Sequence, residues 1–114
     1  MIERIRSIVQ QFPEVTEEPH FEKTSFRIRK KIFATCNAEG TILTVKLSPE
    51  DQNVFSLDPT KIHPVANKWG AQGWTVANTE KLAPEQLTDL LTTAYCEVAP
   101  KTLVEQLRIS QQSK

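Results

Sequence analysis

The chain has 114 residues, and its 14 basic side chains balance 14 acidic ones, so the formal net charge is zero. Zero net charge excludes bulk electrostatic attraction to nucleic acid or membrane, and apolar runs of only a few residues exclude a membrane-spanning segment. We expect a single domain over 1–114 with a core of its own. Two cysteines, Cys36 and Cys96, in a domain that needs no disulfide are typical of a reducing cytoplasm.

Two helices are predicted in the first half of the chain. Apolar residues recur at helical spacing from Ile2 to Phe12, which predicts an amphipathic helix over 2–11 that ends before Pro13. Further along, Ser48 is suited to cap a short helix that begins at Pro49, because serine accepts from free backbone N–H groups and proline is favoured at the first helical position.

Several strands are predicted around these helices. Residues 14–21 are acidic and extended, and Pro19 is typical of an edge strand. A hairpin over 25–37 and a strand over 41–47 follow, with alternating apolar residues that place one face in a core. Segment 73–77 predicts a further strand.

The last third of the chain is predicted to be helical. Pro84 begins the strongest helix, because apolar residues from Leu87 to Val98 form one continuous face. Pro100 interrupts this helix, a last short helix follows, and residues 110–114 are predicted to fray. Segregated strands and helices predict an α+β fold, in which an antiparallel sheet is covered on one face by the N-terminal and C-terminal helices.

The hairpin carries a concentration of positive charge. Apolar and basic residues alternate, so Phe26 and Ile28 are predicted to face the core while the cations face solvent. The patch consists of Arg27, Arg29, Lys30 and Lys31, with Lys23 nearby. One interpretation is contact with backbone phosphates. The other is a solvated sheet face whose cations pair across strands with Glu17, Glu18 and Glu22.

Two tryptophans lie close together in the segment from Lys68 to Trp74. Trp74 is predicted to lie in the core, on the same strand face as Val76. Trp69 follows Lys68 in a glycine-flanked loop, where its ring either stacks on a nucleobase or covers the core.

The chain shows no catalytic or metal-binding constellation. His20 and His63 have no ligand-like spacing to each other or to the cysteines. Cys96 is followed by Glu97, which does not favour a thiolate. We therefore expect no enzymatic activity, no metal and no cofactor.

Nine short sequence strings, spread from about residue 12 to residue 104, resemble a family pattern in their order along the chain. They are Phe12–Val15, Pro19–Phe21, Phe26–Ile28, Lys31–Ala34, Val45–Leu47, Lys68–Gly70, Gly73–Trp74, Ala94–Tyr95 and Ala99–Lys101. In this order they resemble the MmcQ/YjbR family of small bacterial proteins. The resemblance implies a fold like that of CyaY, the bacterial frataxin. It also implies DNA binding through a double-wing arrangement, in which hairpins contact the duplex.

The chain departs from the family pattern in one turn. Arg29-Lys30-Lys31 stands where a glycine commonly precedes the lysine, and a turn with positive φ is strained without glycine. A wider hairpin loop is therefore predicted. The first helix carries Glu3 beside Arg4 and Arg6 rather than a ridge of acids, which argues against a frataxin-like role with iron.

Three functional hypotheses remain. The leading one is weak, sequence-poor binding of the DNA backbone by Lys23, Arg27, Arg29, Lys30, Lys31, Lys68 and Trp69. The alternative is a non-enzymatic module that binds a protein, as yet unidentified, or a small ligand on an open sheet face. The third, an enzyme or metal protein, requires a cleft that holds titratable groups with shifted pKa values.

Overall fold

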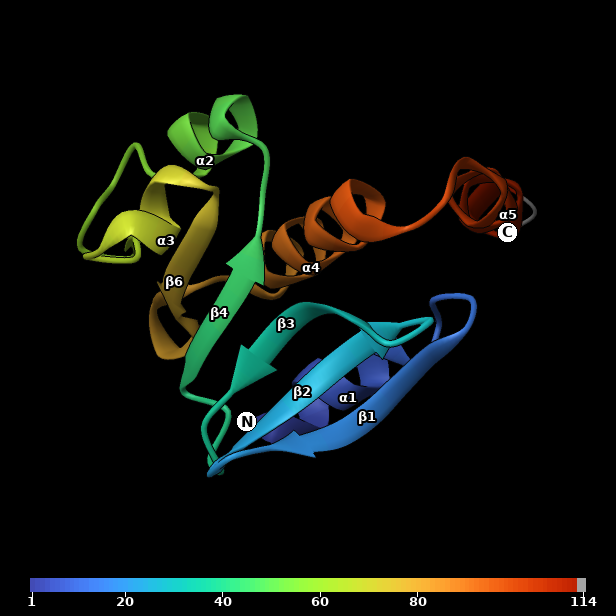
Figure 1. Cartoon of the computed structure of the whole chain (residues 1–114), viewed down its shortest axis with the longest axis horizontal. Coiled ribbons are helices and arrows are strands. Elements are labelled where there is room, and N and C mark those ends of the chain that lie inside the picture. Colours follow the sequence, from blue (N-terminus) through green and yellow to red (C-terminus); the bar gives the residue numbers. More distant parts are fainter. Residues whose placement is uncertain (113–114) are drawn as a thin grey trace.

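The computed structural model describes residues 1–112, which form a six-stranded sheet with helices against one face (Figure 1). The strands are β1 (Val15–His20), β2 (Lys23–Ile28), β3 (Lys31–Cys36), β4 (Ile42–Lys46), β5 (Ile62–Pro64) and β6 (Trp74–Asn78). Their order in the sheet is β1-β2-β3-β4-β6-β5, and every neighbouring pair is antiparallel. The predicted α+β class is confirmed.

Helices α1 (Ile2–Val9) and α4 (Pro84–Val98) lie behind the sheet in the view of Figure 1. Helix α5 (Lys101–Gln112) follows α4, and Leu107 of α5 lines a small hollow with Ile8 and Phe12. The other sheet face, here called the open face, is turned toward the reader in Figure 1. Helices α2 (Pro49–Phe55) and α3 (Lys68–Ala71) lie together at one end of the sheet, and a short 3-10 turn (Thr79–Lys81) joins β6 to α4.

The core lies between the sheet and α1 and α4. Phe26 and Ile28 are buried as predicted, and an aromatic cluster forms where Tyr95 lies 4.9 Å from Phe12 and 5.8 Å from Phe33 between ring centroids. The Tyr95 hydroxyl donates to the carbonyl of Pro13 at 2.8 Å, which joins α4 to the loop after α1. Burial disfavours the phenolate and raises the pKa of Tyr95 to about 12.

Several predicted boundaries shift in the structure. Helix α1 ends at Val9, two residues before the predicted end, and the final helix continues through residues 110–112, which were expected to fray. Residues 113–114 of that predicted tail lie outside the described part. The Ser48 cap is confirmed, because its hydroxyl accepts from the Asp51 N–H at 3.1 Å. Among residues 1–112, no helix has the length and apolar character needed to cross a membrane.

Candidate ligand groove on the open sheet face

The turn between β2 and β3 is a tight two-residue loop. Ile28 pairs with Lys31, so only Arg29 and Lys30 lie between the strands, with φ values of 47° and 74°. Two consecutive positive φ values are typical of a type I′ turn. The predicted wider loop is therefore wrong. A non-glycine residue in this conformation costs about 1–2 kcal/mol, so the turn retains two cations in a strained backbone.

The cations of the hairpin differ in how strongly they are held. The Arg29 guanidinium donates to both carboxylate oxygens of Glu14, at 3.0 and 3.1 Å, and this hydrogen bonding lowers the pKa of Glu14. Arg27 is half-buried and donates to the Ser25 hydroxyl at 2.9 Å. Lys30 and Lys31 are exposed and form no ion pair within residues 1–112.

The interpretation that these cations pair across strands with Glu17, Glu18 and Glu22 named the wrong acids. Glu17 lies opposite Phe26, on the helix side of the sheet, and pairs with Arg6 of α1 at 2.8 Å. Within the described chain, Glu18 and Glu22 form no ion pair with the hairpin. The acid that does pair is Glu14, which lies in the loop before β1 and is itself at positive φ.

Trp74 does not lie in the core, so that prediction is wrong. Thr75 and Ala77 face the helices and are buried, while Trp74 and Val76 are half-buried on the open face. The cause is the pairing of β6 with β4, because partners in register share a face. The core residues Val45 and Leu43 stand opposite Thr75 and Ala77, and Lys46 stands opposite Trp74.

Both tryptophans line a groove of about 430 Å³ on the open face. Its apolar lining comprises Ile32, Val65, Trp69, Trp74 and Val76, and its polar lining comprises His20, Lys23, Thr35 and Thr44. None of these lining residues is a carboxylate, and Lys23 forms no ion pair in the part of the chain that is described. The groove is therefore an apolar surface with one positive charge.

Buried Gln52 of α2 holds the two tryptophan-bearing segments together. Its Nε2 donates to the Gly70 carbonyl at 2.9 Å, the Thr75 hydroxyl at 3.1 Å and the Trp74 carbonyl at 3.3 Å. The backbone N–H of Trp69 donates to the Asn67 side-chain oxygen at 2.9 Å. The backbone under the groove is thus fixed before a ligand arrives.

We expect Gln52→Leu to lower the free energy of unfolding by about 2–3 kcal/mol, because two backbone carbonyls and a buried hydroxyl each lose one hydrogen bond. Urea denaturation followed by circular dichroism measures this change. Asn53→Leu on the exposed side of the same helix is the matched control, and we expect it to shift stability by less than about 0.5 kcal/mol. Equal effects of the two substitutions would contradict the role given to Gln52.

Two lysines border the groove but are already engaged. Lys46 Nζ donates to the Gln72 carbonyl at 2.6 Å, and it lies 3.4 Å from the Leu47 carbonyl. Lys68 Nζ lies 5.7 Å from the centroid of the Trp69 ring, within cation–π range. Trp69 still keeps 49% of its surface exposed. The Trp69 side chain is therefore neither part of the core nor covered by its neighbours.

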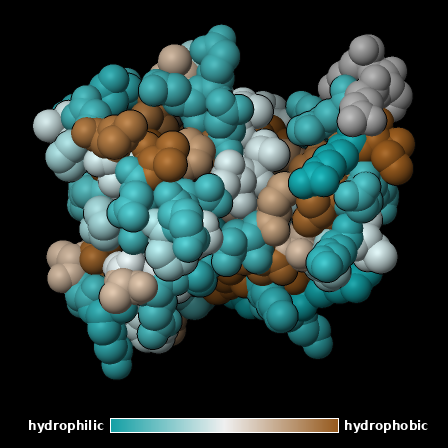
Figure 2. All heavy atoms as spheres, turned by 90° about the horizontal axis from the view of Figure 1, so that it is seen from above, coloured by the Kyte–Doolittle hydropathy of each residue, from teal (hydrophilic) through white to brown (hydrophobic). Residues whose placement is uncertain are grey.

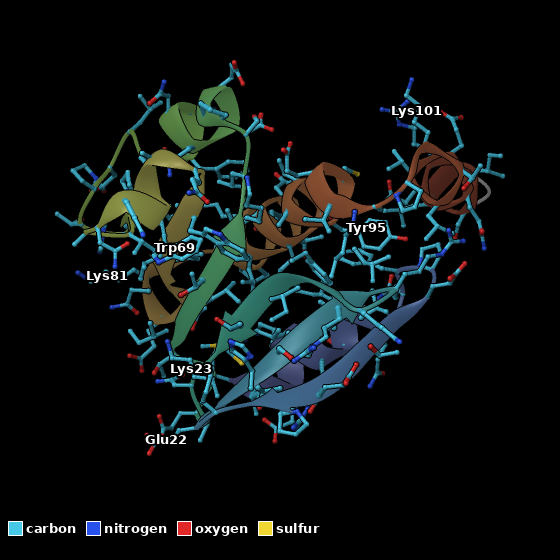
Figure 3. The ribbon with its side chains drawn as sticks, viewed as in Figure 1. Glu22, Lys23, Trp69, Lys81, Tyr95 and Lys101 are labelled. Carbon is cyan, nitrogen blue, oxygen red and sulfur yellow. The ribbon has the colours of Figure 1, made fainter. Side chains whose placement is uncertain are left out.

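Six of the seven predicted site residues fall into two groups. Lys23, Trp69 and the adjacent Lys68 lie at the groove, and Figure 3 shows Trp69 and Lys23 on the same side of the molecule. The second group, Arg29, Lys30 and Lys31, lies at the opposite end of β2. Arg27 stands between them on the open face, and β2 therefore connects the two groups.

Seven of the nine residues that line the groove were not among the predicted site residues. Trp74 and Val76 were assigned to the core side of their strand, and His20 was weighed only as a metal ligand or catalytic residue. The remaining four, which were assigned to no site, are Ile32, Thr35, Thr44 and Val65. The signal available was the alternation in β6, where Trp74 and Val76 occupy one face while Thr75 and Ala77 occupy the other. Only the pairing with β4 decides which face is inside.

Other side chains that carry chemistry are dispersed. Burial raises the pKa of both thiols, Cys36 and Cys96, which disfavours their nucleophilic form. Within residues 1–112, no three His, Cys, Asp or Glu side chains group closely enough to hold a metal ion.

A second hollow, of about 260 Å³, lies between α2, β5 and α4. Figure 2 shows hydrophobic atoms gathered over α2 and the segment after it, where Val54 and Leu57 are 65% and 85% exposed. The lining of this hollow includes the carboxylates Asp58 and Asp89 beside Lys61. It is thus less suited to an anion than the groove on the open face.

Comparison with known proteins places the chain among its relatives. A family model described as YjbR matches residues 10–97. No curated protein matches the chain. Among solved structures, the crystal structure of Deinococcus radiodurans protein DR2400, with the domain DUF419, is similar with a TM-score of 0.76. The match has 21% sequence identity and covers 94% of this chain and 87% of the other, which shows a shared fold.

Proposed function

The chain belongs to the YjbR family, and from this premise we propose that it is a nucleic-acid-binding protein without catalytic chemistry. Binding is weak and poor in sequence preference, because the contacts go to backbone phosphates. The cations that make these contacts are Lys23, Arg27, Lys30 and Lys31 on the β2–β3 hairpin.

The observation that carries this proposal is the strained turn. Glycine or asparagine would occupy positive φ at Arg29 and Lys30 with little strain, yet the chain presents two cations there. Strain of this kind is common at functional sites. Arg29 is neutralised by Glu14, so Lys30 and Lys31 remain as the positive charge at the tip.

The separation of positive and negative side chains over the surface explains how a molecule of zero net charge can bind a polyanion. The formal net charge is zero, so long-range attraction is weak. Lys23, Lys30 and Lys31 are exposed cations without ion pairs in the described part of the chain. Binding then depends on local contacts, and salt weakens it.

Lys30→Gly tests the proposal because it separates stability from binding. Relief of the left-handed strain is expected to raise the free energy of unfolding by about 1 kcal/mol. Loss of one phosphate contact is expected to weaken the binding of a labelled oligonucleotide about fivefold at 50 mM salt. Fluorescence anisotropy measures the binding, and urea denaturation measures the stability.

Two controls make the result interpretable. Lys101→Ala removes a cation from α5, which lies away from Lys23 and Trp69 in Figure 3, and is expected to leave binding unchanged. Lys31→Gly is the control for stability. Residue 31 lies in strand β3, where glycine is destabilising, so this substitution is expected to lower the free energy of unfolding. If Lys30→Gly leaves oligonucleotide affinity unchanged, the proposed role of the turn is rejected.

The apolar lining of the groove favours a second candidate function. A small ligand or a protein partner on the open face would bury Trp69, Trp74 and Val76, and its binding would depend little on salt. Salt-insensitive binding of such a partner, with no measurable affinity for oligonucleotides, would favour this function over the first.

A further inference from the structure

Resting on the proposed function, we infer that the groove on the open face receives one unstacked nucleobase, with its phosphate at Lys23. The preferred ligand of this protein is then a single strand of nucleic acid, rather than the duplex.

The first argument is the shape and chemistry of the groove. A volume of about 430 Å³ lies within the range of small-molecule sites. Trp69 and Trp74 offer indole rings to a planar group, and stacking of a base on an aromatic ring is favourable for every base. Apolar Ile32 and Val76 extend this surface, so a flat ring can exchange water for apolar contacts.

The second argument is charge. The described lining has no carboxylate, and Lys23 stands in it without an ion pair. An anionic group attached to the flat ring is therefore the complementary ligand. Thr35 and Thr44 stand opposite each other in the β3–β4 register, and their hydroxyls can donate to or accept from the edges of different bases.

The third argument is the path that a bound nucleic-acid strand would take as it leaves the groove. Lys23 begins β2, Arg27 lies on the same face further along, and Lys30 and Lys31 follow at the turn. Five residue steps from Lys23 to Ile28 span about 17 Å in a strand. A single strand with its base in the groove thus meets further cations when it runs along β2.

The fourth argument excludes the intact duplex from the groove. Bases of a duplex are stacked and paired, so their faces cannot reach an indole ring without being extruded. Single-stranded segments present free base faces, and aromatic side chains on a sheet are a common way to bind them. Gln52 and Asn67 hold the tryptophan-bearing backbone in place, so this site needs no ordering before it binds.

The test compares a labelled oligothymidylate, a duplex of equal length and thymidine monophosphate by anisotropy and competition at 50 mM salt. We expect the single strand to bind at least about tenfold more tightly than the duplex. Trp69→Ala and Trp74→Ala are each expected to weaken single-strand binding by about tenfold. Leu57→Ala, which also removes an exposed apolar side chain, is the matched control and is expected to change nothing.

The outcomes separate this inference from the function on which it rests. Equal binding of duplex and single strand, with no effect of either tryptophan substitution, overturns the inference and leaves the proposed function standing. Binding of neither polymer rejects both. If thymidine monophosphate competes as well as the oligonucleotide does, the groove binds a free nucleotide, and the inference of a single-stranded ligand is overturned. Trp69 is half-exposed, so Trp69→Ala keeps the test valid if Trp74→Ala fails to fold.

Discussion

Gly73→Ala is expected to lower the free energy of unfolding by about 3–5 kcal/mol. Gly73 has a φ of 104°, which residues with a side chain rarely adopt, and an added Cβ would overlap the Leu47 carbonyl oxygen. Backbone strain contributes about 1–3 kcal/mol, and the clash adds a similar amount because the two nearest atoms belong to the Leu47 backbone, which cannot move aside as a flexible side chain can. The Leu47 N–H also donates to the Gly73 carbonyl at 2.9 Å, so the two segments cannot separate without losing this bond.

Urea denaturation followed by far-ultraviolet circular dichroism measures this loss. Gln72→Ala is the matched control, because residue 72 is exposed at the end of α3 with a φ of −88°. We expect this control to stay within about 0.5 kcal/mol of the parent. A loss below about 1 kcal/mol for Gly73→Ala would show that β4 and the α3–β6 turn have room to move apart.

Raising monovalent salt from 50 to 200 mM is expected to weaken single-strand binding about 50-fold. Four cations contribute, namely Lys23, Arg27, Lys30 and Lys31, and each phosphate contact on a single strand adds about −0.7 to the slope of log affinity against log salt. The slope is then about −2.8. Arg29 is left out because Glu14 already neutralises it.

The slope itself can be partitioned by substitution. Lys30→Ala with Lys31→Ala removes two contacts, so the slope should fall in magnitude by about 1.4. Lys101→Ala with Arg108→Ala removes the same charge from α5 and should leave the slope unchanged. A parent slope near zero would reject phosphate contact and favour the small-ligand or protein-binding alternative.

Much of the fold could be predicted from local pattern. The helix from Pro84 and the Ser48 cap depend on residues close in sequence, and both appear as expected. Family strings spread along the chain indicated the family that the model over 10–97 shows. Segment 60–67 had no clear pattern, and its strand β5 exists only because β6 lies beside it.

The candidate site was harder to predict because it depends on contacts distant in sequence. Trp74 faces outward only because Thr75 stands opposite Val45, a register between segments about 30 residues apart. Arg29 pairs with Glu14 across 15 residues, whereas the alternation of nearby acids indicated Glu17, Glu18 and Glu22. The tight turn was missed because propensity disfavours two non-glycine residues at positive φ, and the short pairing of Ile28 with Lys31 overrides that preference.

The placement of the tryptophans also makes the molecule its own reporter. The chain has two tryptophans and both line the groove, while the tyrosine is in the core. Intrinsic emission excited at long wavelength therefore senses the occupied or empty state of the open face, without any attached dye. The same indoles are already partly hydrated in the native state, so their emission is a poor monitor of denaturation, and near-ultraviolet bands of Tyr95 are the better one.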